Sequence, residues 1–187
     1  MKNIYILHGC CDEDEYFSED YPSPSNYHWI PWLQKQLLLK GYSCQTPEMP
    51  TPYKTSYTAW KNVFENYRVD AETSLIAHSC GCGFFLRWLG ENKKSIHKLV
   101  MVAPWLDLQH TCGDFLNFSL NPELQKRIAE MHILYSSDEP VQGVKESVDL
   151  ILAAYPSAQL HKFDGMRHFC LPEMKTEKFP ALLKIIE

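Results

Sequence analysis

The stretch Ser74-Leu75-Ile76-Ala77-His78-Ser79-Cys80-Gly81-Cys82-Gly83 decides the fold of this chain. Residues 74–77 predict a short strand, residues 78–81 a sharp turn, and residues 83–90 an apolar helix. A serine at the apex of a strand–turn–helix, with small residues two positions before and after it, is the arrangement of a nucleophile elbow. Ala77 stands where glycine is usual, and a difference of one methyl group is small enough for such a turn to accept. We therefore expect Ser79 to be a nucleophile.

The rest of the chain alternates between predicted strands and helices. Further strands are expected at residues 3–7, 42–45, 98–103, 131–135 and 159–163, and further helices at residues 29–40, 56–66, 122–130, 144–154 and 176–186. This alternation predicts an α/β fold with a mainly parallel sheet and helices on both faces. Residues 105–130 begin with an aromatic stretch of little periodicity, so we expect a small cap-like segment there. The length predicts one domain over residues 1–187.

Composition excludes several classes of protein. An apolar fraction of 45% and a charged fraction of 22% are typical of a globular chain. The net charge of -5, with scattered Lys and Arg residues, argues against a nucleic-acid partner. The N-terminal apolar run is too short for a signal peptide and no later run approaches a membrane span, so we expect a cytoplasmic protein that does not bind membranes. In that compartment the seven cysteines are expected to be reduced thiols.

The polar residues that follow the predicted strands complete a catalytic hypothesis. Asp138 follows the fifth strand and His168 follows the last, which gives the chain order Ser, acid, His. A serine hydroxyl is a weak nucleophile and needs a base, and the base needs a carboxylate that fixes its tautomer. We assign these roles to His168 and Asp138, because the spacing before Pro140 and Val141 favours Asp138. The neighbouring Glu139 stays open as the alternative acid.

Further residues are candidates for binding the substrate. The oxyanion of the tetrahedral intermediate needs backbone donors, and the N–H groups of Cys80 and Cys10 are the candidates. The side chains of Trp29 and Trp105 are expected either to line a substrate pocket or to belong to the core. His8 and His78 are interpreted as structural residues.

The sequence also resembles a known family. Four segments carry the resemblance: Trp29-Ile30-Pro31-Trp32-Leu33, Pro47-Glu48-Met49-Pro50, the turn at Ser79, and Asp164-Gly165-Met166-Arg167-His168-Phe169. Together they resemble the small serine hydrolases typified by retinoblastoma-binding protein nine, over nearly the whole chain. The resemblance implies a compact α/β-hydrolase fold with a triad on Ser79, His168 and Asp138. Some members of that family carry two adjacent acids at the acid position.

The main hypothesis is therefore a serine hydrolase that cleaves a small ester, thioester or amide through an acyl-enzyme on Ser79, without a cofactor. The alternative is a non-catalytic protein-binding module on the same fold, with the aromatic cap as a groove for a protein partner. The pattern His-x-Cys occurs three times, at His8, His78 and His168, and thiolate and imidazole are metal ligands. These spacings match no structural zinc pattern, so we expect no metal, although oxidation of nearby thiols could change the activity.

Overall fold

The computed structural model describes residues 2–187 and contains one six-stranded sheet. The strand order is β2-β1-β3-β4-β5-β6, and every neighbouring pair is parallel. The strands are β1 (Asn3–Leu7), β2 (Ser43–Gln45), β3 (Ser74–His78), β4 (Ile96–Val102), β5 (Ile128–Ser136) and β6 (Gln159–Phe163). All six lie where the sequence predicts strands, with boundaries shifted by a few residues.

The register of the central strands brings their carboxyl ends together. Leu7 in β1 pairs with Ala77 in β3, and Ala77 pairs in turn with Met101 in β4. The loops that follow these strands therefore leave the sheet at one edge. The chain adds β2 on one side of β1 and then crosses to add β3 on the other side. The order in which strands are added to the sheet therefore changes direction at the position between β1 and β3. Ligand sites of open parallel sheets form at such a switch point.

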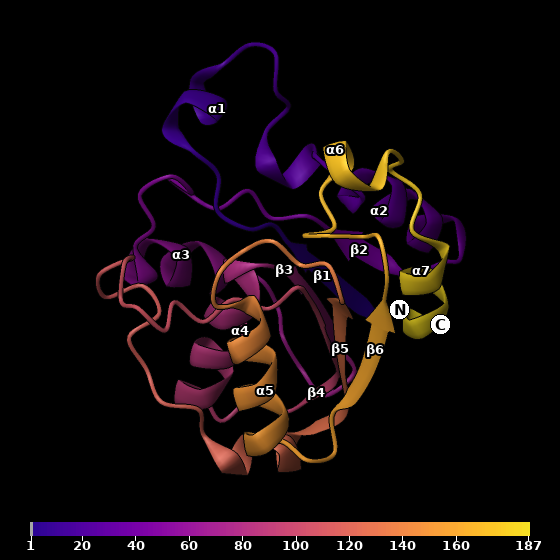
Figure 1. The fold of residues 1–187 in the computed structure, drawn as a ribbon. Coiled ribbons are helices and arrows are strands. Elements are labelled where there is room, and N and C mark those ends of the chain that lie inside the picture. The colour runs from indigo at the N-terminus through magenta and orange to yellow at the C-terminus, as the bar shows by residue number, and fades with distance from the viewer. Residues whose placement is uncertain (1) are drawn as a thin grey trace.

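Helices cover both faces of the sheet, as Figure 1 shows. One face carries α3 (Tyr57–Phe64), α4 (Cys80–Glu91) and α5 (Val144–Ala154), and the other carries α2 (Ile30–Leu39) and α7 (Pro180–Ile186). Side chains alternate between the two layers: Leu75 and Ala77 belong to the core under α4, whereas Ile76 belongs to the core under α2. Every residue of β3 is buried, which is expected of a central parallel strand.

Several local expectations are wrong. The helix expected at residues 122–130 is a short 3₁₀ helix, η2 (Pro122–Arg127), and the chain then enters β5, because Ile128 pairs with Ile96. Three short helices lie outside the predicted ranges: α1 (Glu13–Phe17), η1 (Pro24–Asn26) and α6 (Leu171–Met174). The last helix begins at Pro180 rather than at residue 176, and proline suits the first turn of a helix.

The segment expected to form a cap packs beside α4. The Leu116 side chain is buried, and a Cβ on Gly83 of α4 would lie 2.8 Å from its Cδ2. Arg87 of the same helix donates a hydrogen bond of 3.1 Å to the carbonyl of Phe115. A different segment, the long loop after β1 that includes α1, rises above the carboxyl edge of the sheet (Figure 1). Within residues 2–187, no helix is both long enough and apolar enough to cross a membrane.

Candidate active site

Ser79 lies between β3 and α4 in a strained backbone conformation. Its φ of 53° and ψ of -124° are unfavourable for a residue with a Cβ. Two hydrogen bonds hold this turn: the Ser79 N–H donates to the carbonyl of Val102 at 3.0 Å, and the Ser79 carbonyl accepts from the N–H of Trp105 at 3.2 Å. A strained serine between a strand and a helix, lining a cavity, is the geometry expected of a nucleophile elbow.

Two glycines allow the loop after β1 to approach this turn. A Cβ on Gly9 would lie 3.0 Å from the Cβ of Ser79, and a Cβ on Gly81 would overlap the carbonyl oxygen of His8. Backbone from two separate strands therefore meets beside Ser79. Ala77 fits into the buried end of β3 with an exposed fraction of 0%, so its methyl group is accommodated where glycine is usual.

The carboxylate that contacts His168 belongs to Glu139. The Nδ1 of His168 lies 3.0 Å from Oε1 and 3.1 Å from Oε2 of Glu139. The Glu139 side chain is 1% exposed and the His168 side chain is 12% exposed. A carboxylate can only accept, so Nδ1 carries the proton and Nε2 is left as the basic nitrogen.

The expectation that Asp138 orients His168 is therefore corrected. Asp138 Oδ1 accepts from the Ser136 hydroxyl at 2.5 Å and from the N–H of Arg167 at 3.1 Å, and among residues 2–187 the carboxylate that is hydrogen-bonded to the imidazole is that of Glu139. The hydroxyl of Ser136 lowers the pKa of this exposed carboxyl. Adjacent side chains in a turn point in different directions, and here the second acid points toward the buried side. Through its bond to the Arg167 N–H, Asp138 instead stabilises the loop that carries His168.

The loop around His168 is held by two further side chains. Glu173 Oε2 accepts from the N–H of His168 at 2.8 Å and from the N–H of Cys170 at 3.3 Å. The carbonyl of His168 lies 2.7 Å from Nε2 of His78, which must therefore carry a proton. The interpretation of His78 as a structural residue agrees with this contact. These bonds fix the backbone on both sides of the imidazole.

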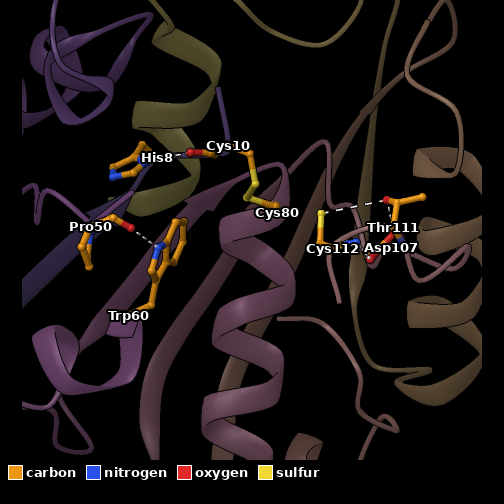
Figure 2. Close-up of a disulfide and its surroundings, with 9 residues drawn as sticks. His8, Cys10, Pro50, Trp60, Cys80, Asp107, Thr111 and Cys112 are labelled. Carbon is orange, nitrogen blue, oxygen red and sulfur yellow. Dashed lines mark hydrogen bonds between the residues drawn. A yellow bond between two sulfur atoms is a disulfide. The ribbon is translucent and has the colours of Figure 1, made fainter. Parts of the chain in front are cut away.

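The residues expected to donate to an oxyanion are joined by a disulfide. Cys10 follows β1, Cys80 begins α4, and their sulfur atoms are bonded, with the two Cα atoms 6.1 Å apart (Figure 2). Throughout residues 2–187, no hydrogen bond uses the backbone N–H of Cys10 or that of Cys80 as its donor. The expectation that all cysteines are reduced thiols is wrong for this pair. The remaining five are free thiols: Cys11, Cys44, Cys82, Cys112 and Cys170.

His8 holds the peptide group that precedes Cys10. Its Nε2 accepts from the N–H of Met49 at 2.9 Å, so the proton lies on Nδ1, which is 2.7 Å from the carbonyl oxygen of Gly9. Burial lowers the pKa of His8. A neutral imidazole therefore fixes the Gly9 carbonyl, as the structural interpretation of His8 expects. The Cys10 N–H of that trans peptide points the opposite way.

His28 is a residue of the site that sequence analysis missed. Its Nδ1 accepts from the N–H of Leu171 at 3.1 Å, so the proton lies on Nε2. Its φ of 58° is strained. Burial and the nearby His168 lower the pKa of His28 to about 4. His28 precedes the apolar helix segment without any periodicity of its own, so the sequence contained no signal that could find it.

Ser79 and His168 line the same cavity of about 270 Å³. They do not form a direct hydrogen bond within the described chain. The long loop after β1 supplies most of the remaining wall, through residues of α1 and of the Pro-rich stretch that follows it. The complete lining is His8, Gly9, Cys10, Cys11, Glu15, Tyr16, Tyr21, Pro22, Pro24, Tyr27, His28, His78, Ser79, His168, Cys170 and Pro172.

Neither candidate tryptophan lines this cavity. Trp29 is fully buried in the core under α2, and it contacts the rings of His78 and Phe179. Trp105 lies beside α5, where its indole N–H donates to the carbonyl of Gln142 at 3.0 Å. Of the two expectations for these residues, core packing describes Trp29. The aromatic wall of the cavity comes instead from Tyr16, Tyr21 and Tyr27.

The His-x-Cys pairs do not assemble into a ligand set. In the part of the chain that the structure describes, no group of three or more His, Cys, Asp or Glu side chains is arranged to hold a metal ion. Instead, the three histidines of these pairs bind backbone groups or the carboxylate of Glu139.

Comparisons with known proteins agree with this geometry. The family model described as "Serine hydrolase" matches residues 20–173. YdeN of Bacillus subtilis (strain 168) is 31% identical over 193 residues, which cover 97% of this chain and 90% of YdeN. The crystal structure of the ydeN gene product superposes with a TM-score of 0.83 and 22% identity, covering 100% of this chain and 97% of that one.

More distant structures share the fold. The esterase domain of a Rhodothermus marinus protein has a TM-score of 0.63 and 14% identity, over 99% of this chain and 84% of that domain. At 14% identity, the similarity to this domain is evidence for a shared fold only. The extent of the family match and the identity to YdeN establish the relationship: this chain belongs to the serine hydrolase family and has the α/β-hydrolase fold.

Proposed function

We propose that this protein hydrolyses a small ester, thioester or amide through an acyl-enzyme formed on Ser79. The observation that carries the proposal is the contact of His168 Nδ1 with both oxygens of the buried Glu139 carboxylate, beside a serine at a strained elbow in the same cavity. Nucleophilic acyl transfer needs an imidazole that a carboxylate orients and a serine that lines the same cavity.

In the acylation step, Ser79 Oγ attacks the carbonyl carbon of the substrate while Nε2 of His168 takes the hydroxyl proton. Glu139 stabilises the resulting imidazolium through Nδ1. The backbone N–H groups of Cys80 and Cys10 donate to the oxyanion, and the positive end of the α4 dipole lies at the same point. When the tetrahedral intermediate collapses, His168 returns the proton to the leaving alcohol, thiol or amine.

In the deacylation step, His168 takes a proton from water, which attacks the acyl carbon. The second tetrahedral intermediate uses the same two donors, and its collapse returns the proton to Ser79 Oγ and releases the acid. His28 and His78 stay neutral during this cycle, because burial lowers the pKa of each. The proton that cycles through the site is therefore carried by His168 alone among these three rings.

The cavity limits the size of the group that is bound. A volume of about 270 Å³ is below the usual range for drug-sized ligands, so the proposal favours short acyl or aryl groups. Tyr16, Tyr21 and Tyr27 provide flat apolar contacts, and Nε2 of His28 is a donor without a partner among residues 2–187. A small aromatic or short aliphatic ester fits these features. The narrower likeness to retinoblastoma-binding protein nine stays a prediction.

Covalent labelling tests the proposal directly. Wild-type protein is expected to react with a fluorophosphonate probe and to hydrolyse p-nitrophenyl acetate, and Ser79→Ala is expected to lose both properties. Ser119→Ala is the matched control, since Ser119 is an exposed serine outside the cavity, and it should behave as wild type. Esterase activity that survives in Ser79→Ala would overturn the proposal. Inertness of wild-type protein toward esters, thioesters and amides would favour the non-catalytic binding module.

A further inference from the structure

The disulfide is located between two backbone groups that the reaction needs. Cys10 and Cys80 are 70 residues apart in sequence, and each contributes one of the N–H groups proposed to bind the oxyanion. A bond between these two side chains fixes the distance between their backbones (Figure 2). Oxyanion donors act by being held in place before charge develops, so a fixed distance between them matters for catalysis.

The two ends of the disulfide differ in how well the rest of the protein holds them. Cys80 is fully buried at the start of α4, in the core under that helix. Cys10 is exposed, and α1, the helix that follows it, contains no buried residue. On the other side of Cys10, His8 and Gly9 are buried and hydrogen-bonded. The disulfide therefore ties the exposed Cys10 to the buried start of α4.

From this arrangement we propose that the Cys10–Cys80 disulfide positions the oxyanion donors, so that a dithiol that opens it lowers turnover at Ser79. The inference rests on the proposed hydrolase function. In the disulfide form the backbones of Cys10 and Cys80 are tied together, with their Cα atoms 6.1 Å apart. In the dithiol form the Gly9–Cys10 peptide keeps the hydrogen bond from His8 to the Gly9 carbonyl but loses its link to α4, so the position of the Cys10 N–H relative to that of Cys80 is less tightly fixed.

The redox step is a thiol–disulfide exchange with a dithiol as reductant. A thiolate of the dithiol attacks the sulfur of Cys10, because Cys10 is exposed and lines the cavity whereas Cys80 is buried. The sulfur–sulfur bond breaks and Cys80 leaves as a thiolate that takes up one proton. The second thiol of the reductant then attacks the mixed disulfide, which leaves Cys10 as a thiol and the reductant as a disulfide. Two electrons and two protons pass to the protein.

The experiment compares the oxidised and the dithiothreitol-reduced wild-type protein, with p-nitrophenyl acetate as substrate and phenylboronic acid as an inhibitor that forms a tetrahedral adduct. Non-reducing peptide mapping should recover a Cys10–Cys80 linked peptide from the oxidised form. Loss of one oxyanion donor costs on the order of 10²–10³ in kcat, so a loosened donor is expected to cost about tenfold or more. The inhibition constant of phenylboronic acid should rise with the fall in kcat, while KM changes by less than about twofold.

Three variants separate this effect from general loosening of the fold. Cys10→Ser should have the kcat of the reduced wild type in both redox conditions. Cys112→Ser, which removes a thiol outside the cavity, should keep both the basal activity and the response to dithiothreitol. Ser79→Ala should be inactive in both conditions. The melting temperature of each sample, measured in parallel, identifies a fall in kcat that comes from unfolding at the assay temperature.

The possible results are distinguishable. Equal kcat in the two redox forms, or faster turnover after reduction, overturns the inference and leaves the hydrolase proposal intact. Absence of the linked peptide after oxidation overturns it as well, and so does a matching loss of kcat in Cys112→Ser. Turnover in Ser79→Ala, or none in oxidised wild type, overturns both proposals together. A fall in kcat that Cys10→Ser reproduces, together with weaker phenylboronic acid binding and a constant KM, supports the inference.

Discussion

His168 Nδ1 lies 3.0 Å from Oε1 of Glu139, whereas the carboxylate of Asp138, one residue earlier, is bonded to Ser136 and to the backbone of Arg167. Two neighbouring acids therefore make different contacts in the same turn. Glu139 is buried against the imidazole, and Asp138 fastens the loop from the exposed side. The contribution of each carboxylate to activity can be measured separately with Glu139→Gln and Asp138→Asn, because each substitution nearly keeps the shape of the side chain and removes its charge.

Glu139→Gln is expected to lower kcat by about 10³ to 10⁴, with little change in KM, because an amide can hold His168 in the wrong tautomer and cannot stabilise the imidazolium. Asp138→Asn is expected to lower kcat less than about fivefold, since only the support of the loop is weakened. Steady-state hydrolysis of p-nitrophenyl acetate by both variants checks this prediction. A larger loss of kcat in Asp138→Asn than in Glu139→Gln would contradict it.

The strands of this protein could be predicted from the sequence because their determinants are local. The apolar residues of β3 are contiguous, and the turn and helix that follow it are marked by Ser79 and two glycines. Alternation of strands and helices then gives the parallel sheet. The error at residues 122–130 has a tertiary cause, because pairing of Ile128 with Ile96 starts a strand where the local sequence predicts continued helix.

The acid and the cavity wall could not be predicted in the same way. The choice between Asp138 and Glu139 depends on the direction of each side chain in a turn, which is set by the hydrogen bonds to Ser136 and Arg167. The wall comes from a loop without periodicity, so His28 and the tyrosines had no pattern that could reveal them. The pairing of Cys10 with Cys80 joins residues 70 apart, and it depends on the register between β1 and β3.

Gly81→Ala is expected to destabilise the protein by about 3 kcal/mol, because the new Cβ would overlap the carbonyl oxygen of His8 and backbone would have to move. Gly90 is the matched control in the same helix. A Cβ on Gly90 would lie 3.7 Å from the Cβ of Asn121, an ordinary contact. Gly90→Ala should therefore stabilise the protein by about 0.5–1 kcal/mol. Urea unfolding measures both changes, and similar values for the two variants would refute the close approach.

Glu173→Ala is expected to lower kcat by about tenfold or more, because it removes the acceptor for the N–H groups of His168 and Cys170 and so allows the imidazole to move. Glu173→Gln keeps one acceptor oxygen and should recover part of this loss. Glu177→Ala removes an exposed carboxylate of the same segment and should have the kcat of wild type. If Glu173→Ala also retains wild-type kcat, this carboxylate does not position His168.

His28 is expected to make the stability of the protein depend on pH. Its pKa is lowered to about 4 in the folded protein by burial and by His168, against about 6.5 in an unfolded chain. Between these values the unfolded chain binds more protons, so the free energy of unfolding rises with pH. The contribution of His28 is complete above about pH 6.5 and is lost as the pH falls toward 4. At pH 5 the loss is on the order of 2 kcal/mol.

His28→Asn tests this dependence, because asparagine tolerates a positive φ and its side-chain oxygen can accept from the N–H of Leu171 in place of Nδ1. Urea unfolding at pH 7.5 and pH 5 should show a smaller loss of stability in His28→Asn than in wild type, by about 2 kcal/mol. His110 is the matched control, since it also has a positive φ but is exposed. His110→Asn should keep the pH dependence of wild type. The charge of His28 is also one of the causes that lower the pKa of the buried His78, so its removal in His28→Asn reduces the pH dependence in the same direction. An unchanged dependence in His28→Asn would mean that His28 titrates alike in the folded and unfolded states.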